Sequence, residues 1–238
     1  MLVRRSAMQR KALCTPDPTT LNLTVQGSVY SRTLGVPISS PVIPLLMSEN
    51  KTQLRQRMRA GRRGLSAYQQ RLHGRAAITL LSRIPQIKRA RHIGMFWPMD
   101  GELDVRHLLR RYPNKYFYLP VLPVEPHPHL GFRRWAGEPL SFRNRFNIPE
   151  PVRSPSRAPN LLDLVLVPLV AFDPSGARLG MGAGFYDRTF EHKLLLPGTG
   201  PQLIGAAHQL QCVEQLPTDN WDIPLDMVVT EKRIYRCR

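Results

Sequence analysis

The feature that most constrains the fold is a nearly continuous apolar run at residues 161–170 (LLDLVLVPLV). The run is far shorter than the roughly 20 apolar residues that are needed to cross a bilayer. Its length and its valine content are typical of a central β-strand that is covered on both faces. Because such strands occur mainly in parallel sheets with helices packed on them, the run favours an α/β architecture.

Strand-like and helix-like segments alternate along the rest of the chain, which supports this interpretation. Short strands are expected at residues 92–97, 116–121, 131–135, 203–207 and 227–230. Helices are expected near residues 105–111 and 186–196. The alternation predicts one α/β domain over residues 47–238, with a largely parallel central sheet flanked by helices on both faces.

Two further helices are expected before the first strand. The apolar side of the first consists of Leu54, Met58 and Leu65. Beside it lies a basic stripe of Lys51, Arg55, Arg59 and Arg62. Ser66 and Gln69 have the spacing of a capping box, which predicts the start of the second helix. The expected apolar face of that helix consists of Leu72, Ala76, Leu80 and Ile84.

Residues 1–46 differ in composition from the rest of the chain. They contain five prolines, ten serines or threonines and five basic residues against one acid. No apolar core follows the basic start, which argues against a secretory signal, and the prolines interrupt the amphipathic helix of a transit peptide. We favour a wrongly assigned start codon, with Met47 as the initiator, and expect residues 1–46 to be disordered and without function.

The charge is strongly positive and unevenly distributed. Thirty-four Lys+Arg against seventeen Asp+Glu give a net charge of +17, which is typical of a protein with an anionic partner. Residues 50–99 contain twelve basic residues and no acidic one, whereas residues 194–231 contain five acidic residues and no Lys or Arg. Charge runs are most often solvated faces. Composition alone leaves nucleic acid, lipid, nucleotide and polycarboxylate open as the anion.

The segment most indicative of chemistry is 171–188 (AFDPSGARLGMGAGFYDR). Three alternating glycines lie between the buried strand and a helix, where backbone N–H groups can approach an anion closely. Arg178 adds a cation, and Asp187 lies where it could hold a divalent metal ion. The pattern is neither a Walker A loop nor the dinucleotide-binding G-x-G-x-x-G. A flexible connector is the plain alternative, but the flanking charges favour phosphate binding.

RLGMGAGFYDR, following a strand that ends in PLVAFD, resembles the signature of the 5-formyltetrahydrofolate cyclo-ligase family. The resemblance extends in order over nearly all of residues 47–238. The pair Lys51-x-x-x-Arg55 is similar to the family's ATP-contacting segment, and residues 96–104 (FWPMDGELD) to its folate-contacting turn. Residues 216–230 (LPTDNWDIPLDMVVT) are similar to its C-terminal block, and bacterial members are the most similar.

The resemblance implies an enzyme of one-carbon folate metabolism that uses ATP and Mg²⁺. Its reaction converts 5-formyltetrahydrofolate, which can carry a polyglutamate tail, to 5,10-methenyltetrahydrofolate and releases ADP and phosphate. The resemblance also implies a cytoplasmic protein without a membrane partner, and we expect a monomer.

The resemblance also assigns residue roles. Arg178 and Tyr186 would be catalytic, Trp97 and Glu102 would bind folate, and Asp187 and Asp222 would ligate Mg²⁺. The ATP-binding residues would be Lys51, Arg55, Arg178, Leu179, Gly180, Met181, Gly182, Ala183, Gly184, Phe185 and Tyr186. Two of these depart from other members: Ala183 stands where some carry lysine, and Phe185 where many carry tyrosine.

Each assignment has a plain structural alternative. Lys51 and Arg55 could be solvated helix charges, Phe96 or Trp97 a core aromatic, and Glu102 only a turn residue. Asp222 and Asp226 could each cap a turn or a helix, which is the better interpretation for Asp226, and the lone His208 is better interpreted as structural. Two other functions are alternatives: an RNA-associated protein using the basic 51–91 segment, and an α/β transferase acting on sugar phosphates or coenzyme A thioesters. The first lacks aromatic stacking residues other than Tyr68, although a secondary affinity for RNA stays open.

Overall fold

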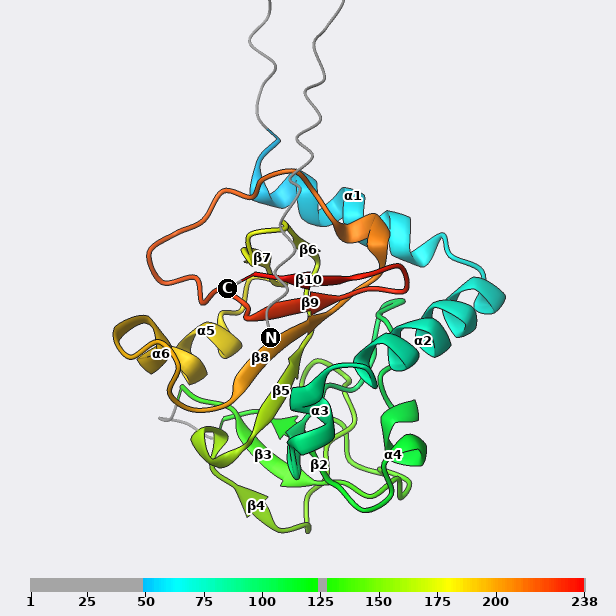
Figure 1. Ribbon diagram of the computed structural model, residues 1–238, viewed down its shortest axis with the longest axis vertical. Helices are drawn as coiled ribbons and strands as arrows, with labels where there is room; N and C mark the ends of the chain where they lie inside the picture. Colours follow the sequence, from blue (N-terminus) through cyan, green and yellow to red (C-terminus); the bar gives the residue numbers. More distant parts are fainter. Residues whose placement is uncertain (1–48, 124–127, 238) are drawn as a thin grey trace, which may run out of the picture. The chain divides into compact units, whose positions relative to one another are not determined.

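The computed structural model describes residues 49–123 and 128–237, which belong to one compact unit (Figure 1). The expectations for residues 1–46, namely disorder and a start at Met47, lie outside the described residues.

A central sheet organises the described residues, and its strand order is β10-β9-β8-β5-β1-β2-β3-β4. The sheet strands are β1 (His92–Gly94), β2 (Tyr116–Val121), β3 (Gly131–Arg134), β4 (Ser156–Arg157), β5 (Leu164–Val167), β8 (Gln202–Ala206), β9 (Met227–Val229) and β10 (Ile234–Arg236). Neighbours from β9 to β2 pair in parallel, whereas β10, β3 and β4 join the two edges antiparallel. The predicted α/β class with a largely parallel sheet is confirmed.

The apolar run forms the middle of this sheet but is divided in the structure. All four residues of β5 are buried, and its neighbours are β1 and β8. The chain then leaves the sheet at Pro168, which has no N–H for a further ladder bond. A small hairpin follows, made of β6 (Ala171–Phe172) and β7 (Arg178–Leu179). This hairpin carries the glycine-rich segment beyond the carboxyl end of β5.

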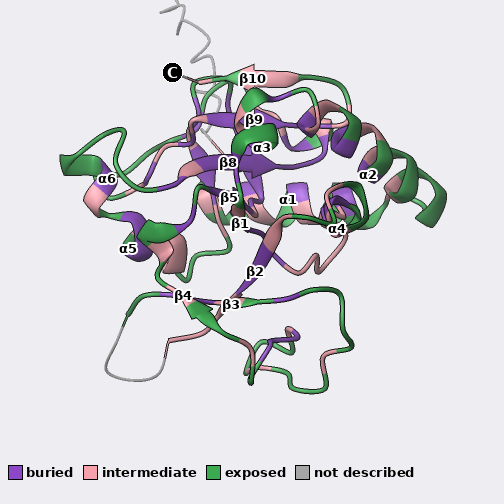
Figure 2. Cartoon of the chain, turned by 60° about the horizontal axis from the view of Figure 1, so that its bottom comes forward, coloured by how far each residue is buried: buried purple, intermediate pink, exposed green. Residues whose placement is uncertain are grey.

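Two apolar clusters cover the two faces of the sheet. The helices are α1 (Lys51–Arg63), α2 (Ala67–Leu81), α3 (Pro85–Arg89), α4 (His107–Arg111), α5 (Phe185–Phe190) and α6 (His192–Leu195), with short 3-10 turns at Pro159–Leu161 (η1) and Gln209–Gln211 (η2). One cluster packs α2, α3 and α4 on one face, and the other packs Phe190 of α5 on the opposite face. Figure 2 shows β5 and β8 buried between these layers and β4 exposed.

Capping side chains define where the first two helices begin. The Asn50 side chain accepts hydrogen bonds from the N–H groups of Thr52 and Gln53, and the Gln53 side-chain oxygen accepts the N–H of Asn50. The predicted capping box of Ser66 and Gln69 is confirmed at the start of α2.

Among the described residues, 49–123 and 128–237, no helix is long and apolar enough to cross a membrane.

The predicted apolar face of the second helix is confirmed only in part: Leu80 packs against the core and Ile84 is buried, but Leu72 does not belong to the buried face. The buried residues of α2 are Gly74, Ala77, Ile78 and Leu81, whereas Leu72 is exposed. A spacing of four residues advances 400° around a helix, so a series of such steps drifts about 40° per step. Mixed steps of three and four keep one face toward the sheet, and α2 buries the residues with that spacing.

Candidate active site

The candidate site lies beyond the carboxyl ends of β1 and β5, where ligands bind in open α/β sheets. The turn after β1 carries Trp97 and Glu102, and the β6–β7 hairpin after β5 leads into the glycine loop, residues 180–184. Helix α1 packs Leu54 and Met58 against this hairpin, beside which it runs in Figure 1. Segments far apart in the sequence therefore meet at one edge of the sheet.

The glycine loop presents its backbone toward solvent. Gly182 and Gly184 have φ values of 103° and 67°, which glycine adopts without strain. Within the part of the chain that the structure describes, the N–H groups of residues 180–184 donate to no protein acceptor. Arg55 Nε donates to Gly180 O at 2.9 Å, and Arg188 donates to Ala183 O at 2.9 Å. Two arginines thus fix the loop through its carbonyl oxygens, while its N–H groups stay available to an anion.

Arg178 and Tyr186 flank the loop with buried polar atoms that lack partners. Arg178 is 8% exposed and donates from one terminal nitrogen to Asp187 Oδ1 at 2.5 Å. Its Nε and the Tyr186 hydroxyl are buried without a hydrogen-bond partner among the described residues. Burial raises the pKa of the Tyr186 hydroxyl, and the negative charge of Glu102 raises it further, so the hydroxyl stays protonated. Orphaned buried donors are costly, which indicates a ligand at this point.

Glu102 lies in the turn after β1 and is nearly enclosed. Its carboxylate accepts the N–H of Met99 at 3.1 Å and lies 3.6 Å from an Arg62 nitrogen. Burial raises the Glu102 pKa to about 7, even though the Arg62 charge and the Met99 hydrogen bond act in the opposite direction. A buried carboxyl group whose pKa lies near neutrality is typical of a functional site.

Three arginines of α1 converge on Asp100 in the same turn. Arg59 and Arg62 contact its Oδ2 at 2.8 and 2.9 Å, and Arg63 contacts its Oδ1. Burial alone would raise the Asp100 pKa, but the hydrogen bonds from these arginines outweigh burial and lower it to about 2. Arg62 also donates to Asp100 O at 2.7 Å and is itself fully buried. The turn that carries Glu102 is therefore fastened to α1.

Arg62 was predicted to belong to the basic stripe of the first helix, and this prediction is wrong because the side chain is buried. It lies four residues after Met58 and eight after Leu54, so it shares their buried side of α1. That spacing was the available signal. Arg57 pairs with Glu49 at 2.6 Å, so every basic side chain of α1 has a protein partner and none is simply a solvated charge.

Lys51 contacts acids rather than the glycine loop. Its ammonium lies 2.7 Å from Asp219 and 3.2 Å from Asp222. The hydrogen bond with Asp219 is the largest influence that raises the Lys51 pKa, so the side chain stays charged. Lys51 therefore connects α1 to the acidic segment that follows η2.

The predicted Mg²⁺ ligands, Asp187 and Asp222, are brought to one corner. Asp187 Oδ1 accepts the N–H of Ile223, the residue after Asp222, at 3.1 Å. Asp187 Oδ2 and Asp222 Oδ1 accept no hydrogen bond from residues 49–123 and 128–237. Mg²⁺ is usually held by one or two carboxylates together with substrate phosphates. Two free carboxylate oxygens beside a loop of free amides fit that ion.

Of the two aromatics for which a core role was the alternative, Phe96 is a core residue at 3% exposure. Trp97 is half-buried; its ring lies edge-on to Trp135 at 5.4 Å, and the Arg106 guanidinium lies 4.8 Å from its centroid. Phe185 packs edge-on to Phe146 at 6.1 Å, so this position contributes an apolar contact instead of a hydroxyl.

A shallow surface concavity of about 550 Å³ lies away from this site. Its basic lining residues are Arg89, Arg91, Arg111 and Lys115. These residues adjoin the amino ends of β1 and β2, the opposite edge of the sheet from the glycine loop. The concavity therefore forms no part of the candidate site.

Comparison with known proteins gives a consistent result. The family model of the 5-formyltetrahydrofolate cyclo-ligase family matches residues 47–231. The chain is 38% identical over 182 residues to a 5-formyltetrahydrofolate cyclo-ligase of Escherichia coli K12, covering 75% of this chain and 98% of the relative. It is 35% identical over 185 residues to that of Haemophilus influenzae, covering 75% and 96%.

A solved structure agrees with these relatives. The Aquifex aeolicus 5,10-methenyltetrahydrofolate synthetase superposes with a TM-score of 0.67 at 32% identity, covering 79% of this chain and 93% of that one. The sheet order, the glycine loop and the sequence matches point the same way, and the chain belongs to the 5-formyltetrahydrofolate cyclo-ligase family.

Proposed function

We propose that the site beyond β1 and β5 is where this chain performs its family's reaction, the ATP-dependent conversion of 5-formyltetrahydrofolate to 5,10-methenyltetrahydrofolate. The observation that carries the assignment is the pair of buried, unpartnered donors, Arg178 Nε and the Tyr186 hydroxyl, beside a loop of free amides. These donors suit the phosphates of ATP. The Glu102 carboxylate suits the hydrogen-bond donors of a pterin ring. Its negative charge also raises the pKa of the Tyr186 hydroxyl.

The reaction joins two displacement steps. The formyl oxygen attacks the γ-phosphorus, an O–P bond forms and ADP leaves. N10 then attacks the activated carbon and loses its proton, and phosphate departs with the former formyl oxygen. Phosphorylation is required because an amide oxygen is otherwise a poor leaving group.

Several side chains serve these steps through position and charge. Arg178 offers a guanidinium fixed by Asp187 to the oxygens of the transferring group, where charge develops. The loop amides hold the phosphates, and Tyr186 donates its proton in a hydrogen bond because its raised pKa keeps the hydroxyl neutral. Trp97 lines the folate side of the site.

Asp187 and Asp222 would hold Mg²⁺ through the two carboxylate oxygens that have no protein partner. Such an ion would offset negative charge on the phosphates of ATP. Without a bound ion, the charge of Asp222 is paired with Lys51, and the charge of Asp187 is paired with Arg178.

The direct test uses the optical spectrum of the product. Purified protein with ATP, Mg²⁺ and 5-formyltetrahydrofolate is expected to generate the near-ultraviolet absorbance of methenyltetrahydrofolate. Omission of ATP should abolish the signal. Folded protein that produces no ATP-dependent absorbance would refute the assignment.

Asp187→Asn is expected to lower kcat/KM for ATP by about 10- to 100-fold and to raise the Mg²⁺ concentration required for half-maximal rate. The amide is a weaker ligand and no longer neutralises Arg178. Steady-state rates over a Mg²⁺ titration measure both effects. Asp226→Asn is the matched control, because the Asp226 carboxylate accepts the N–H of Leu203 and an amide oxygen can replace it. Unchanged Mg²⁺ dependence in Asp187→Asn would contradict the role.

Glu102 is expected to make folate binding pH-dependent. Its pKa of about 7 means that the carboxylate ionises as pH rises through neutrality, and the ionised form accepts hydrogen bonds from the pterin. The KM for 5-formyltetrahydrofolate should therefore fall with rising pH in the wild type. In Glu102→Gln the KM should be higher and insensitive to pH in this range, and in Glu102→Ala higher still.

Stability gives an independent readout of the same group. A carboxyl whose folded pKa rises from 4.5 to about 7 stabilises the fold below pH 4.5 and loses that contribution as pH rises through 7. Denaturant unfolding of Glu102→Gln should thus show a gain of about 3 kcal/mol over wild type at alkaline pH that disappears in acid. If the Glu102 variants change only the KM for ATP and leave the KM for 5-formyltetrahydrofolate unchanged, the assignment of Glu102 to folate binding is wrong.

Cytoplasmic location, a monomeric state and secondary RNA affinity stay predictions of the sequence. Gel filtration and a salt-dependent RNA-binding assay test the last two.

A further inference from the structure

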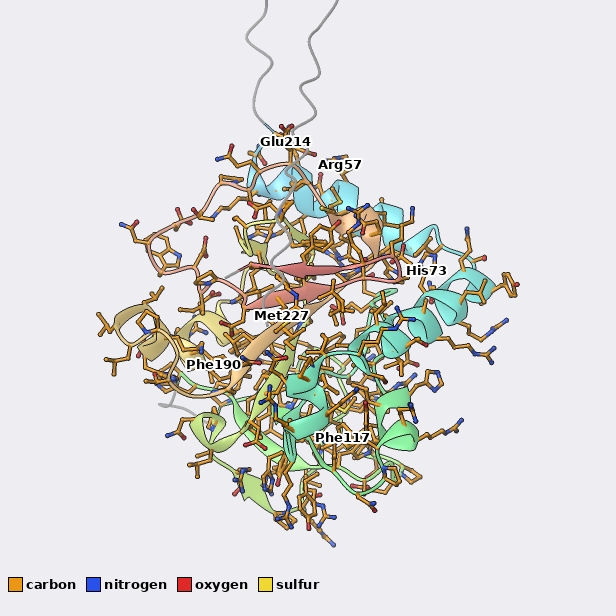
Figure 3. All side chains as sticks on the ribbon, in the orientation of Figure 1. Arg57, His73, Phe117, Phe190, Glu214 and Met227 are labelled. Carbon is orange, nitrogen blue, oxygen red and sulfur yellow. The ribbon has the colours of Figure 1, made fainter. Side chains whose placement is uncertain are left out.

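A second cluster of ligating side chains lies outside the proposed ATP and folate site. His73 belongs to α2, His208 follows β8, and Glu231 follows β9. One nitrogen of each histidine and one carboxylate oxygen all lie within 4.8 Å of one another. Figure 3 shows His73 on α2 beside the tip of the β9–β10 hairpin, which contains Glu231. Three elements distant in sequence thus place a ligand atom at one point.

The tautomer of His208 leaves a lone pair directed into the cluster. His208 is fully buried, and its Nε2 lies 3.0 Å from Gly101 O. A carbonyl oxygen only accepts, so Nε2 carries the proton and Nδ1 carries the lone pair. His208 Nδ1 lies 2.9 Å from His73 Nδ1 and accepts a hydrogen bond from it. Metal-binding histidines are oriented in the same way, with the second ring nitrogen donating to a backbone carbonyl.

Glu231 is oriented by a similar arrangement. Its Oε2 accepts the N–H of Gln209 at 2.8 Å, while its Oε1 lies 4.0 Å from His73 Nδ1. The Glu231 side chain is 9% exposed, so the charge is held in the protein close to both imidazoles. One oxygen thus fixes the carboxylate and the other is directed toward the histidines.

We propose that His73 Nδ1, His208 Nδ1 and Glu231 Oε1 form a binding site for a divalent transition-metal ion of the zinc type. Two imidazole nitrogens and one carboxylate oxygen are a ligand set that zinc accepts, with water in the fourth position. The set does not suit Mg²⁺ or Ca²⁺, which prefer oxygen ligands, so this site is chemically distinct from the pair Asp187 and Asp222.

Only small movements are needed to bind the ion. Two Zn–N bonds of about 2.0–2.1 Å at a tetrahedral angle separate the nitrogens by about 3.3 Å. The nitrogens are 2.9 Å apart in the structure, and the His73 side chain, at 23% exposure, has room to turn. The ion replaces the proton between the rings, and that proton moves to His73 Nε2, which leaves both imidazoles neutral.

The environment of His208 keeps its lone pair available to an ion. The ring is fully buried, and its Nε2–H donates to Gly101 O, so Nδ1 is the nitrogen left to bind a metal ion. The ion would also draw α2 and the β9–β10 hairpin together around His208. Because His208 donates to Gly101, the residue before Glu102, the site braces the turn that carries the folate-binding carboxylate.

The test measures metal binding by tag-free, chelator-treated protein, with ZnCl₂ as the titrant. Zinc at about 100 times its Kd is expected to raise the Tm by about 5–10 °C. His73→Ala and Glu231→Gln should each abolish that shift, and His73→Ala should fold because His73 is a partly exposed helix residue. His107→Ala, which removes an exposed histidine elsewhere, should keep it. A shift that survives in both site variants, or no shift in the wild type, would overturn the proposal.

Cobalt(II) provides a second readout that does not depend on variants. Bound at this site, Co²⁺ should show the visible bands of a four-coordinate ion with nitrogen and oxygen ligands. A thiolate-to-cobalt charge-transfer band would instead assign the metal to Cys212 or Cys237 and contradict the site.

Discussion

Arg62→Met is expected to lower the free energy of unfolding by about 3–5 kcal/mol, the usual cost of removing one partner of a buried ion pair. Arg62 is fully buried and serves the Asp100 carboxylate, the Asp100 carbonyl and the Leu169 carbonyl. Methionine fills much of the volume but satisfies none of these acceptors. Chemical denaturation of purified protein measures the loss.

The same substitution should weaken folate binding by a separate route. Arg62 is the largest influence that lowers the Glu102 pKa, so its loss moves that pKa further above 7 and leaves Glu102 protonated at neutral pH. The KM for folate should rise more at pH 7 than in alkaline buffer. Arg63→Met is the matched control: Arg63 contacts the same Asp100 from an exposed position and should cost no more than about 1 kcal/mol. Equal losses of unfolding free energy in Arg62→Met and Arg63→Met would contradict the inference that burial makes Arg62 the more important partner of Asp100.

Arg178→Lys is expected to lower kcat by about 10²–10³-fold, the usual cost of losing one group that stabilises transition-state charge. Lysine keeps the charge and can still pair with Asp187, but it lacks the planar fork that offers Nε and a terminal nitrogen to phosphate oxygens together. Single-turnover rates measured by methenyltetrahydrofolate absorbance separate this effect from product release.

A second arginine beside the glycine loop provides the control for this result. Arg188 is exposed and bonds the carbonyl of Ala183, on the outer side of the loop. Arg188→Lys should change kcat by less than about tenfold, since a lysine can also donate to that carbonyl. If the kcat of Arg178→Lys equals that of the wild type, Arg178 takes no part in stabilising the transition state.

Local sequence signals were sufficient for much of the fold. The apolar run of β5, the alternation of strands and helices, and the capping box of Ser66 were confirmed because each depends on neighbouring residues alone. The antiparallel strand β10 and the true buried face of α2 were missed. The buried residues of α2 follow a local spacing of three and four residues, so that signal was present in the sequence, whereas the pairing of β10 depends on which strand edge the rest of the chain presents.

The candidate site divides in the same way. The glycine loop with Arg178 and Asp187 was recognisable as a contiguous segment. The spacing of Arg62 from Leu54 and Met58 signals its buried side, but its pairing with Asp100 and the pairing of Lys51 with Asp219 arise only when α1 docks on distant loops. The cluster of His73, His208 and Glu231 had no local signal either, since its members are isolated in sequence. A lone histidine such as His208 is uninformative until its partners are placed around it.

The docking of α1 has a consequence for how the protein is made. Helix α1 stands at the start of the family domain, yet its contacts reach Gly180, Asp219 and Asp222, separated from it by 125, 168 and 171 residues. During translation this basic helix leaves the ribosome before the rest of the family domain, whereas its acidic partners are synthesised near the end of that domain. Closing such long loops is slow and exposes unpaired surface meanwhile. The active centre is therefore completed only when nearly all of the domain has been released, and a stalled nascent chain should carry no part of the activity.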